Sequence, residues 1–156
     1  MIFPVFAFAA PGEELFGADE KKQMMQFALE QFWGKAIDSQ GKPIEPKDEK
    51  ERAALPISYE QGAYILDKGG ETGLAEWCGV PWEERFQLIM QKFRAGLPSE
   101  TQVAYAGVLH GLAQQTMLES LAGETCSADT KKQIELIVKE DIKNLTWSLK
   151  AADESQ

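Results

Sequence analysis

Apolar and polar residues alternate at helical spacing through most of this chain. From Asp19 to about Ile37 the apolar positions lie three or four residues apart, which predicts a first amphipathic helix. Its buried face would consist of Met25, Ala28, Leu29, Phe32 and Ala36. Strand patterns are nearly absent, so helices should dominate the fold.

Further helices are expected after residue 56. Ser58 and Gln61 have the spacing of a capping box, so a helix should begin at about Tyr59. Glycine closes helices readily, and Gly69-Gly70 is therefore predicted to end this one. A separate short helix is expected from Thr72 to Cys78.

Three more helices are predicted in the second half of the chain. The first follows Pro81 and ends at Gly96-Leu97-Pro98, with a buried face of Phe86, Ile89, Met90 and Phe93. The next begins with a second Ser-x-x-Gln capping sequence at Ser99 and ends before Gly123. The last is capped by Ser127, and its core stripe is Ile134, Val138, Ile142, Leu145 and Leu149.

These patterns predict an all-α bundle of about five main helices plus short ones. Residues 11–150 would form a single domain, interrupted after the first helix by a polar linker at 38–56, with one helical turn at about 48–55. The polar residues 151–156 are predicted to be a flexible tail.

The apolar, uncharged segment 1–10 has two interpretations. Its length and its small residues suit the remnant of a secretory signal, but no Lys or Arg precedes Lys21. The alternative is a segment that packs on the domain or on a partner. No window approaches the roughly 20 apolar residues of a membrane span, so none is expected.

Composition and charge narrow the choice of partner. The chain has 156 residues, 44% of them hydrophobic, with 25 Asp and Glu against 16 Lys and Arg, for a net charge of −9. A chain this acidic, without a basic stripe, lacks the electrostatic footprint of a nucleic-acid binder and would be repelled by an acidic membrane surface. A protein with a basic surface is the partner that this charge favours.

The two cysteines, Cys78 and Cys126, both lie at expected helix boundaries. A disulfide between them would staple two helices and add roughly 4 kcal/mol through loop entropy. It would also indicate an oxidising compartment, periplasmic or extracellular. The alternative is two unrelated buried thiols in a cytoplasmic protein.

The sequence contains little that points to catalysis. His110 is the only histidine, so a histidine-rich metal site is excluded, and we expect no cofactor and no metal. An enzyme would have to be a thiol or hydrolytic one that uses Cys78, Cys126 or His110. The simpler interpretation of His110 is a side chain that packs between helices.

Aromatic side chains supply the candidates for binding. Most are expected in the core, namely Phe27, Phe32, Trp33, Trp77, Trp82, Phe86, Phe93 and Trp147. Trp33 lies outside the predicted apolar stripe and could anchor either the linker or a partner. The candidate partner contacts are Trp33, Trp82, Glu83 and Glu84.

From Cys78 to Leu149 the order is cysteine, two helices, cysteine and a capped charged helix, with the sequences CGVPWEERFQLI and TCSADTKKQIELIVKEDIKNL. This order resembles small periplasmic all-helical proteins of Gram-negative bacteria, namely acid-activated chaperones and the helical immunity proteins that block type VI secretion effectors. The resemblance implies a disulfide between helices and a function in protein binding.

We therefore expect a non-enzymatic, acidic protein-binding module in the periplasm, dimeric or bound to a partner such as a secreted effector. A periplasmic stress chaperone is the alternative function, an uncharacterised thiol or hydrolytic enzyme is the third, and the cytoplasm is the alternative location.

Overall fold

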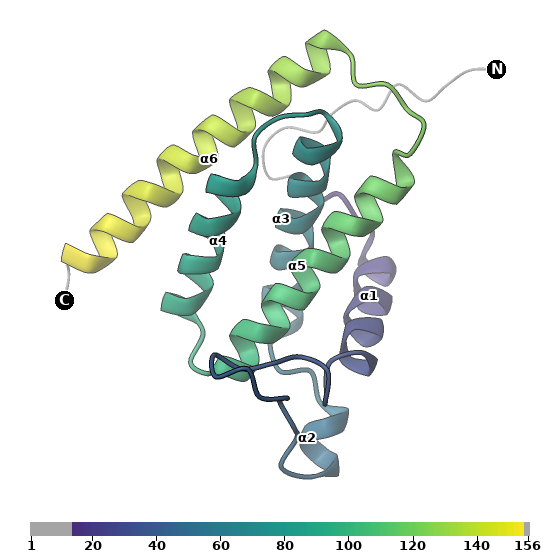
Figure 1. Ribbon diagram of the computed structural model, residues 1–156, viewed down its shortest axis with the longest axis vertical. Helices are drawn as coiled ribbons and strands as arrows, with labels where there is room; N and C mark the ends of the chain where they lie inside the picture. Colours follow the sequence, from purple (N-terminus) through teal and green to yellow (C-terminus); the bar gives the residue numbers. More distant parts are fainter. Residues whose placement is uncertain (1–13, 155–156) are drawn as a thin grey trace.

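The structure is an all-α bundle, which confirms the predicted fold class. A computed structural model describes residues 14–154 of the chain. Five main helices and one short helix follow one another (Figure 1): α1 (Ala18–Glu30), α2 (Glu49–Ala53), α3 (Tyr59–Trp77), α4 (Glu83–Gly96), α5 (Glu100–Ser120) and α6 (Ala128–Glu154).

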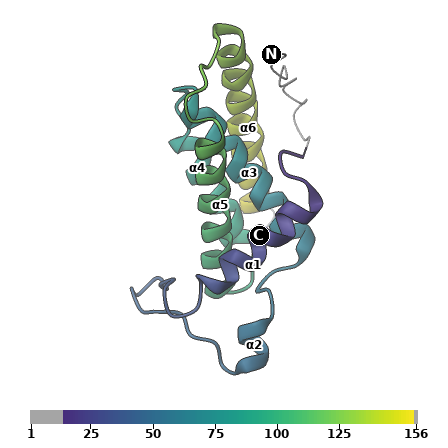
Figure 2. The same cartoon turned by 90° about the vertical axis from the view of Figure 1, so that its right-hand side faces the viewer.

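α3 and α5 form the centre of the bundle. Figure 1 shows α1 on one side of this pair and α4 and α6 on the other. Figure 2 shows the linker and α2 at one end of the bundle, away from the turn that joins α5 to α6. α6 is an outer helix that packs against α4 and α3.

Glycines on α3 allow α5 to approach closely. A Cβ atom placed on Gly69 would lie 2.4 Å from the carbonyl O of His110, and one on Gly73 would lie 2.6 Å from that of Gln114. Real Cβ atoms do not approach a carbonyl oxygen so closely, so only glycine fits at these positions.

This packing corrects the prediction that a helix ends at Gly69-Gly70. α3 is one continuous helix to Trp77, and the separate short helix expected at Thr72–Cys78 is its last part. Gly69 makes room for α5 and Gly70 for Leu15 and Phe16, and the glycine that closes α3 is Gly79, with a φ of 70°.

Gly69→Ala is expected to lower the free energy of unfolding by about 2 kcal/mol. The added methyl must push α3 away from α5, which outweighs the higher helix propensity of alanine. Gly111→Ala on α5 is the control: a Cβ there meets nothing within 4 Å, so stability should rise by roughly 0.5–1 kcal/mol. Urea denaturation measures the free energy of unfolding of both variants. Equal changes in the two variants would refute the packing argument.

The predicted helix caps are present. Ser58 and Gln61 form the reciprocal capping box at the start of α3. Ser99 accepts a hydrogen bond from the backbone of the first turn of α5, and Ser127 does the same for α6. Gly123, after α5, has a φ of 84°. Local signals therefore define these helix ends.

The first helix is shorter than predicted. α1 ends at Glu30 instead of Ile37, and the chain continues through turns in which Gly34 has a φ of 76°. A residue in that left-handed conformation cannot continue an α-helix. Phe32 is still fully buried, at 0% exposure, although it lies beyond the helix.

Trp33 holds the linker against the bundle. Its indole Nε1 donates a hydrogen bond of 3.1 Å to the carbonyl O of Arg52, and its ring packs edge-on against Phe32. The linker 38–56 contains the predicted helical turn as α2 and buries Ile44. Trp33 thus has the linker contact that was one of its two expected roles.

The last helix extends further than predicted. α6 continues to Glu154, so residues 151–154 are helical and the predicted flexible tail is corrected there. Ala151 and Ala152 favour this extension because alanine has the highest helix propensity. The expected apolar segment 1–10 lies outside the described residues.

The hydrophobic core has two parts. The larger lies between α1, α3, α4 and α5, and the smaller joins the end of α3 to the first half of α6 through residues such as Leu74, Ile134 and Val138. The prediction that the aromatic residues are mainly core is wrong for Phe27, which is 51% exposed, and for Trp147, which is 71% exposed.

Candidate functional site

A disulfide links Cys78 to Cys126, with their Cα atoms 5.3 Å apart. Cys78 follows α3 and Cys126 precedes α6, so the bond fixes the start of α6 to the end of α3. Both sulfurs are used in the bond, and neither is available as a nucleophile in this state.

Arg85 on α4 is the largest fully buried side chain among the described residues, at 1% exposure. Its Nε and Nη2 atoms both lie 2.8 Å from Oδ2 of Asp141 on α6. Nη2 also pairs with Glu71 on α3, and Nη1 donates to Thr72 at 3.0 Å. The Arg85 cluster, as we call it, comprises Lys68, Glu71, Thr72, Arg85, His110 and Asp141, and it ties α4 to α3 and α6.

His110 extends this cluster into α5. Its Nε2 lies 3.0 Å from Thr72 Oγ1, and that hydroxyl already donates its proton to the carbonyl O of Lys68. Nε2 must therefore carry the hydrogen and donate it to Thr72. Nδ1 is then an acceptor, and it is a buried polar atom without a hydrogen-bond partner in the described part of the chain.

His110 makes stability depend on pH. Burial, and to a lesser extent the Arg85 charge, lowers its pKa to about 4. The unfolded chain takes up this proton near pH 6.5, so it binds more protons than the folded state between pH 6.5 and 4. Stability should fall by roughly 3 kcal/mol through this group as the pH drops from 7 to 4.

His110→Gln keeps a hydrogen-bond donor near Thr72 but cannot take up the proton. Urea denaturation at pH 7 and pH 4 should show a loss in this variant that is smaller than the wild-type loss by roughly 3 kcal/mol. Equal losses of stability between pH 7 and pH 4 in the variant and the wild type would refute the contribution of His110 to the pH dependence.

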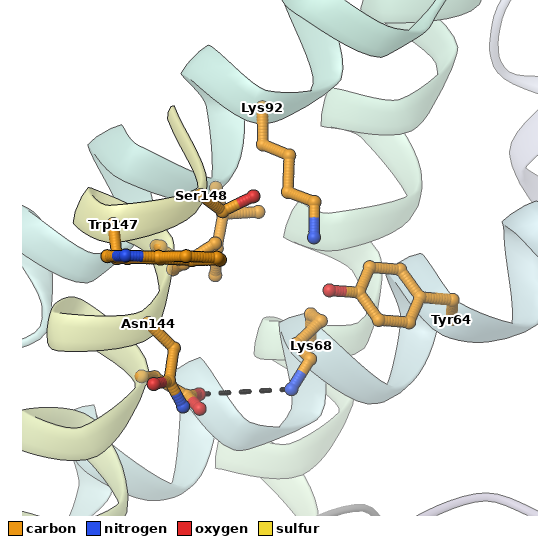
Figure 3. A pocket seen from close by; sticks show the side chains of 9 residues that line it. Tyr64, Lys68, Lys92, Asn144, Trp147 and Ser148 are labelled. Carbon is orange, nitrogen blue, oxygen red and sulfur yellow. Dashed lines mark ion pairs between the residues drawn. The ribbon is translucent and has the colours of Figure 1, made fainter. Parts of the chain in front are cut away.

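A groove of about 350 Å³ lies between α3, α4 and α6. We call it the aromatic groove, and it is lined mainly by Tyr64, Lys68, Lys92, Asn144, Trp147 and Ser148 (Figure 3). Two buried apolar side chains, Ile89 and Leu145, also line it and form its base.

The Arg85 cluster supports this groove. Asp141 and Lys68 belong to both, and Lys68 Nζ lies 3.8 Å from Asp141 Oδ2 (Figure 3) and 3.1 Å from Glu71 Oε2. The groove walls on α3 and α6 are thereby held by partly buried ion pairs, so the groove is largely preformed.

Positive charge lies against an aromatic ring in the groove. The Lys68 and Lys92 ammonium groups lie 5.6 and 5.8 Å from the centre of the Tyr64 ring, within the range of cation–π contacts. Tyr64 is 43% exposed. Ammonium, hydroxyl and aromatic groups of this kind can bind a ligand, but they include no activated nucleophile.

The other sequence candidates lie elsewhere. Trp82 is half-buried, packs edge-on against Phe86, and its backbone N–H donates to the Glu83 carboxylate. Glu83 and Glu84 are exposed in the first turn of α4, whereas the groove meets α4 further along, at Ile89 and Lys92. Their role in partner contact stays a prediction.

Sequence reasoning missed Arg85, Lys21 and the exposure of Trp147. Arg85 lies four residues before Ile89 on the buried face of α4, and Lys21 lies four residues before Met25 on that of α1, where each finds carboxylate partners. Trp147 follows Leu145 by two residues, which turns it about 200° around the helix. Spacing alone could have revealed all three.

The comparisons add no relative to this picture. No family model matches the chain, and neither a curated protein nor a solved structure matches it.

Among residues 14–154, no group of three His, Cys, Asp or Glu side chains is placed to hold a metal ion. Over the same range, no helix is both long and apolar enough to cross a membrane.

Proposed function

We propose that this protein is a non-catalytic binding module that recognises another protein through the aromatic groove. The observation that carries the proposal is Trp147, a large apolar side chain left 71% exposed at the rim of a groove whose other rim is Tyr64. Tryptophan and tyrosine are enriched among the residues that dominate binding energy at protein interfaces.

The support beneath the groove favours binding. The disulfide fixes the start of α6, and the Asp141–Arg85 ion pair fixes its middle. A partner that docks on a preformed surface loses less conformational entropy than one that must order it. The groove thus suits tight recognition.

The form of this function that we propose is an inhibitor or immunity protein that occludes a secreted effector in the periplasm. The disulfide supports an oxidising compartment, and the net charge of −9 would steer a partner with a basic surface. Once the partner is known, its association rate should fall as salt is raised.

Site-specific photocrosslinking tests the binding function. A photoreactive amino acid replaces Trp147 in one variant and Leu136 in the other, and both are expressed in the native compartment. Leu136 is the matched control, because it is 67% exposed on the same helix but outside the groove. We expect one defined protein adduct from position 147 only, which mass spectrometry identifies and binding of the purified partner verifies.

Adducts of equal yield at both positions, or an identified partner that binds Trp147→Ala as tightly as the wild type, would contradict this proposal. A hot-spot tryptophan should contribute about 2 kcal/mol or more, which is roughly a 30-fold change in Kd.

An acid-activated chaperone is the second candidate, favoured by one observation. The carboxylates of Glu71 and Asp141 hold Arg85 between the helices, so the loss of these ion pairs would loosen α6 and expose Ile134 and Val138. Such a chaperone should bind a hydrophobic dye and suppress client aggregation at pH 3. A chain that stays folded and monomeric there is not one.

A further inference from the structure

The aromatic groove is locally cationic although the protein is acidic. Lys68 is paired with Glu71 and Asp141. Lys92 differs, because in residues 14–154 no carboxylate lies within ion-pair distance of its ammonium group, whose recorded contact is the Tyr64 ring. Figure 3 shows Lys92 reaching from α4 into the space between Tyr64 and the α6 side chains. An entering anion would therefore find one uncompensated positive charge.

The aromatic face that remains for a ligand is on α6. The Tyr64 ring already has two ammonium groups close to it. Trp147 is 71% exposed, and no ring-stacking or cation–π contact is recorded for its indole among the described residues. A planar apolar group in the groove would thus stack on Trp147, as aromatic pairs do at interfaces.

The base of the groove suits an apolar group and its rim suits a polar one. Ile89 and Leu145 are 2% and 8% exposed. Ser148 places a hydroxyl on the side of the groove toward Lys92, and Asn144 places an amide at the other end, toward Lys68 (Figure 3). A volume of about 350 Å³ is at the lower end for ligand pockets, so the space suits a single residue.

We propose that the groove binds the C-terminal aromatic residue of the partner polypeptide. The ring lies on Trp147 above Ile89 and Leu145, and the terminal α-carboxylate pairs with Lys92. An α-carboxylate lies only a few bonds from the ring of the same residue, which matches the proximity of Lys92 to the aromatic walls. This inference rests on the proposed function, because it names the part of the partner that enters the groove.

Two small probes test the inference directly on the full chain. N-acetyl-L-phenylalanine carries the ring and the carboxylate, and N-acetyl-L-phenylalaninamide carries the ring without the charge. The protein has four tryptophans, so NMR should give four indole N–H signals, and the signal that is missing in Trp147→Phe is that of Trp147. We expect the carboxylate probe to shift this signal saturably and to bind about 3- to 5-fold more tightly than the amide.

A pair of lysine variants tests whether the Lys92 ammonium group binds the carboxylate of the probe. Lys92→Gln should abolish the preference for the carboxylate by lowering its affinity about 3- to 5-fold, and it should leave the amide unchanged. Lys150→Gln is the control, since Lys150 is an exposed lysine on α6 outside the groove. It should retain the wild-type preference.

Three results would overturn the inference: no shift of the Trp147 signal with either probe, equal affinity for the two probes, or a preference that survives Lys92→Gln. Its failure is distinguishable from that of the proposed function. A crosslinked partner at position 147 without probe binding would mean that the groove binds another part of the partner. Probe binding without any crosslinked partner would mean that the protein-binding function is wrong.

Discussion

Replacing Arg85 by methionine is expected to lower the free energy of unfolding by about 3 kcal/mol. Methionine keeps much of the arginine volume, so the loss arises from the missing charge. Glu71 and Asp141 would then lack their main partner at 14% and 21% side-chain exposure. Because both carboxylates keep some contact with water, the expected loss is near the lower end for a broken buried ion pair.

Arg94→Met on the same helix is the matched control. Arg94 is exposed, so its replacement should change stability by less than about 0.5 kcal/mol. Urea denaturation at pH 7 compares the two variants. If Arg85→Met were as stable as Arg94→Met, the Arg85 cluster could not be what holds α6 in place.

Removal of the disulfide is expected to cost about 4 kcal/mol. Cys78 and Cys126 are 48 residues apart, and breaking a loop of that size releases a large conformational entropy in the unfolded chain. The double variant Cys78→Ala/Cys126→Ala should therefore unfold at a much lower urea concentration.

The slope of the denaturation curve tests the origin of this loss. An unfolded chain without the crosslink exposes more surface, so the m value should rise along with the loss of stability. Thiol titration of the denatured wild-type protein should find no reactive thiol. A loss below about 1 kcal/mol, or two titratable thiols, would contradict the staple.

Helix ends were predictable from sequence because local interactions decide them. The box formed by Ser58 and Gln61 and the stop before Gly123 each involve neighbours within one helical turn. The disulfide could be anticipated for a different reason, since both cysteines lie at helix boundaries. Cysteines at the boundaries of two helices can meet when those helices pack.

Gly69-Gly70 shows where local reasoning fails. A glycine that ends a helix and one that makes room for a neighbouring segment look alike in sequence, and only the positions of α5 beside Gly69 and of Phe16 beside Gly70 distinguish them. In α3, packing with α5 offsets the low helix propensity of glycine.

The groove was beyond prediction for a different reason. Tyr64, Lys92 and Trp147 belong to three helices, and their proximity depends on how α6 crosses α3 and α4. That crossing is set by Arg85 and by the smaller part of the core, in which residues of α3 pack against residues of α6. Because these contacts join distant segments, no single stretch of the sequence predicts them.

The local stability of α6 decreases from its start to its end. The helix is fixed at its start by the disulfide, and Leu145 is its last buried residue in the described chain. Backbone amides before this point should exchange with deuterium only through cooperative unfolding, whereas those of residues 146–154 can exchange through fraying of the last turns. Trp147 and Ser148 follow Leu145 within one helical turn, so their amides should exchange sooner than those of Tyr64 and Lys68 on α3, while the ion pairs of Asp141 keep this wall of the groove in position.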